Sequence, residues 1–355
     1  MKALITLLLA VTCSVIGNAT NNIYGDVDCD GSVTVGDITV LYNYLLNNDT
    51  SFLSTSDVDG DGYITSSDIT AIYDIILNGY VPKDTIKVLA IGNSFVDDPM
   101  AYLNSLVTAS GIDRNKLCVY SLVKSSSSLD YWAGVLENGD SVTITKRAGL
   151  MKMTITNAPL SEIIAQDWDV ITVQQVSNLA QNPQSLNPSL TYLVNKIREH
   201  CTNNNVVVGW QQVWSYWYEN DNLQSSIENW QRINEVAILT FDYGVDMIIP
   251  TGTAIQNART TELNTPHGLT RDGKHLAYGV GRYVAACTWF EALIAPVFGV
   301  SVVGNSAIHA ITDNEQVNSA YETVAVTDAN RTLCQQCAVA AVSHPNELMQ
   351  SGLNR

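Results

Sequence analysis

The sequence Ile-Lys-Val-Leu-Ala-Ile-Gly-Asn-Ser-Phe, residues 86–95, places a serine directly after a short run of apolar and β-branched residues. Such a run is typical of a buried strand, and the Gly-Asn-Ser that follows it indicates a turn. A helix is predicted next, with Asp98 as its N-cap, Pro99 as its first residue and apolar residues at helical spacing over 100–107. Ser94 is therefore expected in a strand-to-helix turn, where the carboxyl end of a parallel strand opens onto the usual ligand crevice.

The chain beyond this turn alternates between strand and helix patterns. Further strands are predicted at 117–123, 170–174, 206–209 and 247–250, and helices at 190–200, 226–239 and 279–295. Two alternating segments within 139–157 favour an inserted hairpin. Strand–helix alternation predicts an α/β fold, in which helices cover both faces of a parallel sheet in a three-layer α/β/α sandwich.

Asp272 and His275 stand three residues apart, just before the helix predicted near the end of the chain. This spacing lets a carboxylate hold an imidazole in one tautomer while the other ring nitrogen faces a nucleophile. Taken alone, an Asp-x-x-His pair is weak evidence and is more typical of a surface turn with a capping aspartate. The pair gains weight from Ser94, which stands earlier in the chain at the end of the first predicted strand.

Two motifs resemble the conserved blocks of the SGNH (GDSL-like) hydrolases. Residues 92–95, Gly-Asn-Ser-Phe, resemble the first block with Asn in place of the usual Asp, and residues 272–276, Asp-Gly-Lys-His-Leu, resemble the last block. The resemblance covers about residues 86–345 and implies an SGNH/flavodoxin-like sandwich. It also implies a serine hydrolase of small esters, with Ser94 as nucleophile, His275 as base and Asp272 as the group that orients the base.

The two middle blocks of that family, which supply donors to the oxyanion hole, depart from the usual pattern. Residues 125–129 hold no Gly, so the resemblance implies only a backbone N–H there, from Ser126. Gln-Gln-Val-Ser-Asn at 174–178 replaces the usual third block, and a side-chain amide from Gln175, or else from Asn178, would take the place of the family's Asn. A role in holding the loop by hydrogen bonds stays open for these amides.

The composition is strongly acidic, with a formal net charge of −17 and a pI near 4.5. This charge argues against nucleic acid as a partner, because the phosphate backbone would be repelled. Residues 20–80 contain ten Asp but no Glu, Lys or Arg. An acidic block of one residue type at regular spacing indicates a metal site rather than a solvated face.

That acidic block contains an internal repeat with calcium-ligand spacing. The candidate ligands of the first loop are Asp26, Asp28, Asp30, Ser32 and Asp37, and those of the second, 31 residues later, are Asp57, Asp59, Asp61, Tyr63 and Asp68. Carboxylates at loop positions 1, 3, 5 and 12, with a backbone carbonyl at position 7, can converge on one hard cation. An ordinary acidic surface loop would not explain the duplication, so two calcium ions are predicted.

Each loop leads directly into an amphipathic helix, and the pair resembles a type I dockerin over residues 24–79. Position 12 is Asp rather than Glu, and no helix is evident before either loop, which separates the pattern from an EF-hand pair. The resemblance implies a small all-α domain that docks its enzyme onto a cohesin of a scaffold protein. A purely structural calcium module remains the alternative.

Residues 1–19 are typical of a signal peptide, with a nearly unbroken apolar run over 3–16 and small residues at 17 and 19. A membrane anchor is the alternative, but the run is short for a span, and Cys13 offers a second alternative as a lipid-modified cysteine. A secreted chain is therefore expected. Its expected parts are a signal peptide at 1–19, the calcium module at 20–80, a linker at 81–85 and the hydrolase domain at 86–355.

The combined patterns predict a secreted serine esterase that removes acetyl or other small acyl groups from carbohydrate. A lipase or thioesterase of the same fold would need a longer apolar groove, and a scaffold-attached glycan-binding protein without activity is a third possibility. Five aromatic residues follow the strand predicted at 206–209, namely Trp210, Trp214, Tyr216, Trp217 and Tyr218. They suit either stacking on sugar rings or packing in the core, and the sequence leaves both open.

Overall fold

The computed structural model describes residues 25–28, 30, 32–47, 56, 58, 64–78, 85–148 and 151–349. The described residues fall into two compact units, one with helices α1 and α2 and the other beginning at strand β1. The expected signal peptide, the linker residues 81–84 and four candidate ligands of the second loop lie outside the described residues, these ligands being Asp57, Asp59, Asp61 and Tyr63. In the part of the chain that is described, no helix is long and apolar enough to cross a membrane.

The small unit consists of two helices of equal length, α1 (Val35–Asn47) and α2 (Ser66–Asn78). Leu41 and Ile72 occupy equivalent positions in the repeat, and both are fully buried in the core that the helices share. The predicted all-α character of this unit is confirmed. Most of its stability must come from this apolar contact, since isolated helices of this length are marginal in water.

The large unit is built on a seven-stranded sheet in the order β4-β3-β2-β1-β5-β6-β7. Its strands are β1 (Ile86–Gly92), β2 (Leu117–Val123), β3 (Ser141–Ala148), β4 (Met151–Pro159), β5 (Val170–Val173), β6 (Val207–Gln211) and β7 (Met247–Ile249). The pairs from β2 through β1, β5 and β6 to β7 are all parallel. Strands β3 and β4 form the predicted hairpin and extend the sheet in antiparallel fashion.

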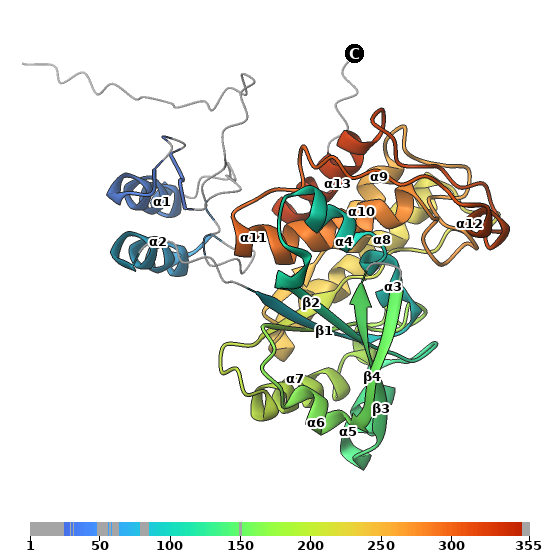
Figure 1. Ribbon diagram of the computed structural model, residues 1–355, viewed down its shortest axis with the longest axis horizontal. Coiled ribbons are helices and arrows are strands. Elements are labelled where there is room, and N and C mark those ends of the chain that lie inside the picture. Colours follow the sequence, from blue (N-terminus) through green and yellow to red (C-terminus); the bar gives the residue numbers. More distant parts are fainter. Residues whose placement is uncertain are drawn as a thin grey trace, which may run out of the picture. The chain divides into compact units, whose positions relative to one another are not determined.

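Helices cover both faces of this sheet, which confirms the predicted three-layer α/β/α sandwich (Figure 1). One layer contains α3 (Asp97–Met100), α4 (Leu103–Ala109), α9 (Thr251–Arg259), α10 (Val280–Trp289) and α13 (Arg331–Ser343). The other contains α5 (Leu129–Asn138), α6 (Leu160–Ile164) and α7 (Ser189–His200). Helices α8 (Leu223–Leu239), α11 (Ala295–Phe298) and α12 (Asp313–Val317) complete the unit, and a π-helical turn at Phe290–Ile294 joins α10 to α11.

Strand β1 lies inside the sheet and contributes to both cores. Val88 and Ala90 belong to one apolar cluster, whereas Leu89 and Ile91 belong to the cluster on the opposite face. Successive strand side chains point to opposite faces, so a strand covered on both sides needs a continuous apolar run. This requirement explains why residues 86–91 are almost all apolar, the pattern from which the strand was predicted.

The expected start of the helix after Ser94 is corrected by the structure. Asp98 lies within α3, and no side-chain cap is present at the residue that precedes that helix. The predicted helix is also divided at Tyr102, whose φ of −114° and ψ of 4° are not helical. Asp98 is instead completely buried and pairs with two arginines from a distant part of the chain.

Candidate active site and calcium loop

Ser94 lies at the carboxyl end of β1, where the chain turns into the short 3-10 helix η1 (Ser94–Val96). The side chain of Asn93 shapes this turn, because its Oδ1 accepts hydrogen bonds from the Phe95 N–H at 3.1 Å and from Gln174 Nε2 at 2.8 Å. Its Nδ2 donates to the Ser127 carbonyl at 3.1 Å. Strand β1 pairs with β2 on one side and with β5 on the other, so the strand order switches from one side of the sheet to the other at β1. In folds of this kind the usual ligand crevice lies at such a switch point.

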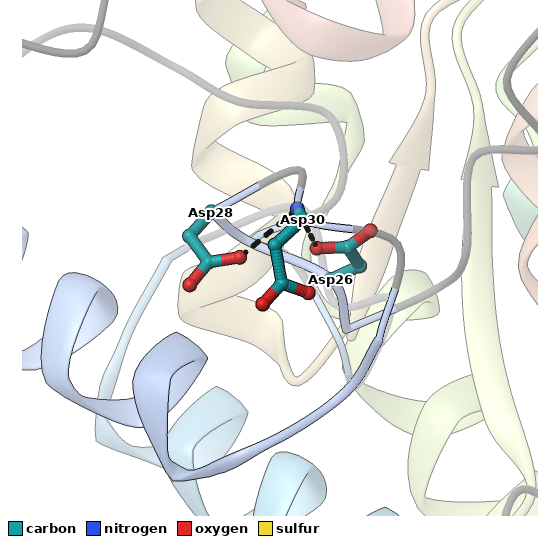
Figure 2. Close-up of side chains that lie close together, drawn as sticks. All are labelled: Asp26, Asp28 and Asp30. Atoms are coloured by element: carbon teal, nitrogen blue, oxygen red, sulfur yellow. Dashed lines mark hydrogen bonds between the residues drawn. The ribbon is translucent and has the colours of Figure 1, made fainter.

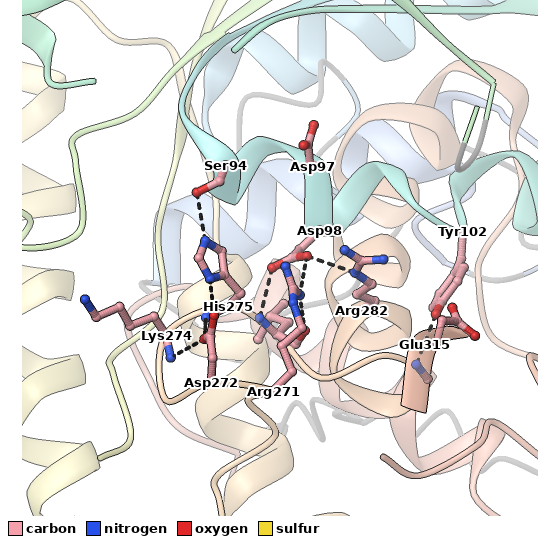
Figure 3. A network of polar contacts seen from close by, with 12 residues as sticks. Ser94, Asp97, Asp98, Tyr102, Arg271, Asp272, Lys274, His275, Arg282 and Glu315 are labelled. Carbon is pink, nitrogen blue, oxygen red and sulfur yellow. Dashed lines mark hydrogen bonds and ion pairs between the residues drawn. The ribbon is translucent and has the colours of Figure 1, made fainter. Parts of the chain in front are cut away.

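His275 comes from the other end of the sequence, and its Nε2 lies 2.8 Å from Ser94 Oγ (Figure 3). Its Nδ1 lies 2.6 Å from Asp272 Oδ2. The structure thus brings together the three predicted catalytic residues in a serine–imidazole–carboxylate chain. With the proton held on Nδ1 by the carboxylate, Nε2 is left to accept the proton of the serine hydroxyl.

The loop around Asp272 is folded so that the carboxylate is held on both sides. Asp272 Oδ1 accepts hydrogen bonds from the backbone N–H groups of Lys274 at 2.9 Å and His275 at 2.7 Å. Partial burial by itself would raise the pKa of Asp272, but these hydrogen bonds and that from the His275 ring outweigh it and lower the pKa. Gly273 has a φ of +81°, a conformation that glycine adopts at low cost and that allows this tight return of the chain.

Aromatic rings pack against the imidazole and its loop. The ring of His275 meets that of Phe95 edge to face at 5.4 Å between centroids. Phe95 in turn stacks on Trp214 at 4.3 Å, and Trp214 Nε1 donates a hydrogen bond of 2.6 Å to the Lys274 carbonyl. Phe95 was not singled out from the sequence, although it adjoins the nucleophile, since one phenylalanine beside a turn is most often a core residue.

A buried charge network anchors the same loop and was also missed from the sequence (Figure 3). Asp98 Oδ1 lies 2.9 Å from Arg271 Nη1 and 2.8 Å from Arg282 Nε, and Oδ2 accepts the Leu276 N–H at 2.9 Å. Burial opposes ionisation of Asp98, but Arg282 and Arg271 lower its pKa, so it is held as a carboxylate. The one sequence signal was Arg282 in an otherwise apolar helix, because a buried charge requires a partner.

The serine opens onto a cavity of about 810 Å³ that is lined mainly by small polar side chains. Ser126 and Asn178, two of the predicted oxyanion donors, line this cavity with Ser94 and His275. In the described part of the chain, no hydrogen-bond acceptor is found for the backbone N–H of Ser94 or of Ser126. Both groups are therefore free to donate to a ligand.

Gln175, the third predicted donor, is not among the residues that line the cavity. Its Nε2 donates to the Ser185 carbonyl at 3.0 Å, and its Oε1 accepts from the Leu129 N–H at 3.2 Å and the Val176 N–H at 2.8 Å. These are the contacts of a residue that holds loops together. The Gln175 amide is thus engaged in the loop-holding role that the sequence left open, and not at the cavity.

Ser126 adopts a left-handed backbone conformation, with a φ of +55°. Non-glycine residues rarely take this conformation, which usually reflects a local constraint at a functional turn. The neighbouring Ser127 supplies the constraint, because its Oγ donates to the Gly92 carbonyl at 2.9 Å and accepts from Trp132 Nε1 at 3.0 Å. Ser126 thus holds a backbone conformation that glycine adopts more readily than other residues.

In the small unit, the carboxylates of Asp26, Asp28 and Asp30 converge, and each offers an oxygen within 4.8 Å of the others (Figure 2). Asp37 lies in the first turn of α1 and closes the loop, because its oxygens accept the backbone N–H groups of Val27 at 2.7 Å and Thr34 at 2.7 Å. Asp68 makes the equivalent bonds to Val58 at 2.6 Å and Thr65 at 2.7 Å. Three converging hard oxygen donors fit a calcium ion, which would also relieve their mutual repulsion.

Comparisons with known proteins agree with this division of the chain. The family described as a domain of unknown function, DUF4886, matches residues 87–331, and the dockerin type I domain matches residues 24–77. No curated protein matches. A crystal structure of a DUF4886 family protein from Bacteroides uniformis ATCC 8492 superposes with a TM-score of 0.62 at 31% identity, covering 76% of this chain and 98% of that one.

Two other solved structures share less with the chain. A protein named as a GDSL-like lipase, from Parabacteroides merdae ATCC 43184, gives a TM-score of 0.41 at 12% identity and covers 60% of this chain and 97% of its own. The acetyl xylan esterase AlAXEase gives 0.39 at 14% identity, with 59% and 100% covered. From the match over residues 87–331, the chain belongs to the DUF4886 domain family and carries a dockerin type I domain at residues 24–77.

Proposed function

We propose that the large unit is a serine esterase that removes acetyl or other small acyl groups from carbohydrate. One observation carries the proposal, namely the hydrogen-bonded chain from Ser94 Oγ through the His275 ring to Asp272, with distances of 2.8 and 2.6 Å. The resemblance of residues 92–95 and 272–276 to the SGNH hydrolases supports the same chemistry.

In the first half of the reaction, His275 Nε2 removes the hydroxyl proton as Ser94 Oγ attacks the carbonyl carbon of the ester. Asp272 stabilises the imidazolium that forms, through the proton on Nδ1. The tetrahedral intermediate collapses when the sugar oxygen leaves with the proton from Nε2. Water then attacks the acyl-serine by the same route, releasing the acid and the free serine.

The negative oxygen of each tetrahedral intermediate needs preorganised donors beside Ser94. The backbone N–H groups of Ser94 and Ser126 and the side-chain amide of Asn178 are the donors that we assign. Ser126 and Asn178 both line the cavity with the serine. The lining combines several serines, including Ser125, with a few apolar side chains such as Val176 and Leu179. The serines offer hydrogen bonds to a hydrophilic alcohol, and the small apolar part suits a short acyl group.

The test is hydrolysis of p-nitrophenyl acetate and of acetylated xylan, pectin and mucin glycans by the full chain. Ser94→Ala should lower kcat by at least about 10³-fold, because the nucleophile is lost while the fold is kept. Ser105→Ala, an exposed serine on α4, is the matched control and should retain activity. Equal activity in the wild type and Ser94→Ala would contradict the proposal. Binding of glycans without turnover of any ester would favour the non-catalytic glycan-binding role.

For the dockerin domain, we infer two structural calcium ions and a cohesin-like partner on a scaffold outside the cell. Large apolar side chains at equivalent positions of the two helices are exposed, as expected for a docking surface: Tyr42 by 54%, Leu46 by 65%, Tyr73 by 49% and Leu77 by 74%. Calorimetry should give about two calcium ions per chain, lost when Asp28→Ala and Asp59→Ala are combined. A wild-type chain that takes up no calcium would refute this assignment.

A further inference from the structure

A second cavity, of about 500 Å³, adjoins the one that contains Ser94. The two cavities share Ser177, Asn178 and Tyr216 in their walls. The Ser177 and Tyr216 hydroxyl groups are hydrogen-bonded to each other, so this pair stands between the cavities as a common wall. The second cavity therefore lies next to the place where a ligand reacting at Ser94 would be held.

The apolar surfaces of the second cavity are aromatic in part. Trp214 and Ile233 are buried and contribute side chains to its lining. Tyr216 and Tyr218 meet edge to face at 5.4 Å, and Tyr218 is 47% exposed. An exposed tyrosine ring at a cavity mouth offers an apolar face to the C–H side of a sugar and a hydroxyl group to its edge.

The polar part of the lining is dominated by side-chain amides, including Asn178 and Asn229, together with one carboxylate, Asp221. Amides both donate and accept hydrogen bonds, which matches the hydroxyl groups of a sugar. Among the described residues that line this cavity there is no Lys, Arg or His, and Asp221 adds a carboxylate. Arg232 lies behind the lining, with Nη1 3.5 Å from the side-chain oxygens of Gln181 and Asn229, so charges of both signs border the cavity and neither dominates it. Asp221 Oδ2 also accepts the Tyr218 N–H at 2.6 Å and so fixes the segment that carries the ring.

From this juxtaposition we propose that the second cavity is a substrate subsite that binds a neutral sugar ring next to the acylated one, with Tyr218 as the stacking residue. The inference rests on the proposed esterase function and names where its carbohydrate binds. A fatty acyl chain is the competing occupant, and the amide-rich lining disfavours it, because the chain would cover these amides without giving them hydrogen-bond partners.

The test compares two substrates of the full chain, p-nitrophenyl acetate and the acetylated glycan oligosaccharide that the wild type turns over fastest. Tyr218→Ala should lower the ratio of kcat/KM for the oligosaccharide to kcat/KM for p-nitrophenyl acetate by about tenfold, the loss of one stacked ring. Tyr218→Phe should keep most of the ratio. Tyr131→Ala is the matched control, since that ring is 38% exposed and also meets a neighbouring ring edge to face, at 5.2 Å from Trp132.

An unchanged ratio in Tyr218→Ala would overturn the subsite. If kcat/KM had fallen equally on both substrates, Tyr218 would act through the catalytic residues instead. A selective loss on p-nitrophenyl decanoate would overturn it in favour of an acyl-chain site. Should the wild type hydrolyse no ester, the esterase proposal fails separately. Calorimetry with the unacetylated oligosaccharide then decides the subsite: binding that is weakened in Tyr218→Ala upholds it, and no binding to the wild type refutes it.

Discussion

The buried carboxylate of Asp98 accepts a hydrogen bond of 2.9 Å from the backbone N–H of Leu276, the residue that follows His275. Its other oxygen holds Arg271 and Arg282, so the whole loop that carries Asp272 and His275 is tied to the helix that follows Ser94. The helix after Ser94 thereby positions His275, the proposed base. A displacement of the base of about 1 Å is enough to cost about 10²-fold in rate.

We expect Asp98→Ala to lower the free energy of unfolding by about 3–5 kcal/mol, because two arginines lose a buried partner. Chemical denaturation measures this change. Asp328→Ala is the control, since that carboxylate is 84% exposed in its pair with Arg331, and it should cost less than about 0.5 kcal/mol. In Asp98→Asn, which keeps an acceptor for Leu276, the loss in kcat should be smaller than in Asp98→Ala. A kcat in Asp98→Ala equal to that of the wild type would refute the positioning role.

Substitution of the two candidate amides should have different consequences. Asn178 is exposed and lines the cavity, so Asn178→Ala should lower kcat by about 10²- to 10³-fold with little change in Tm. Gln175 is buried and joins three backbone groups, so Gln175→Ala should lower Tm. Steady-state kinetics and thermal denaturation of both variants check this. A Tm loss in Asn178→Ala with unchanged kcat would reverse the assignment.

Ser126→Gly tests whether the oxyanion donor at this position is the backbone or the side chain. Glycine adopts the φ of +55° readily and keeps the N–H, so activity should stay within about threefold of the wild type. Relief of the backbone strain should add up to about 1 kcal/mol to the free energy of unfolding. If kcat instead fell by 10²-fold or more, the hydroxyl group and not the N–H would be the donor.

The buried carboxyl group of Glu291 should make the free energy of unfolding depend on pH. Burial raises its pKa to about 7, although the Val302 N–H and the Ser301 hydroxyl favour its ionised form. In the unfolded chain its pKa is about 4.3, so the folded state binds more protons between these values and loses stability as the pH rises through about 7. Glu291→Gln removes this titration and should stabilise the protein by about 3–4 kcal/mol at pH 8 relative to the wild type. Chemical denaturation at pH 5 and pH 8 checks it, and an equal effect at both values would contradict it.

The sequence alone was sufficient to predict the strands that are buried on both faces of the sheet. Strand β2 begins and ends at the predicted residues, and the doubly covered β1 was predicted from its apolar run. The duplicated spacing of aspartates was equally evident, because the candidate calcium ligands of each loop are close together in sequence. The pairing of Asp272 with His275 is local in the same way, since three residues and one glycine turn separate them.

Tertiary structure decided what depends on contacts between distant residues. Ser94 and His275 are 181 residues apart, and only the packed sheet brings Oγ within 2.8 Å of Nε2. Asp98, which the sequence placed as a helix cap, is paired by folding with Arg271 and Arg282, because a buried carboxylate takes its charge partner from whatever element packs against it. Within the single segment 174–178, folding directed the Gln175 amide into loop contacts and placed Asn178 at the cavity, a difference that residue type alone does not predict.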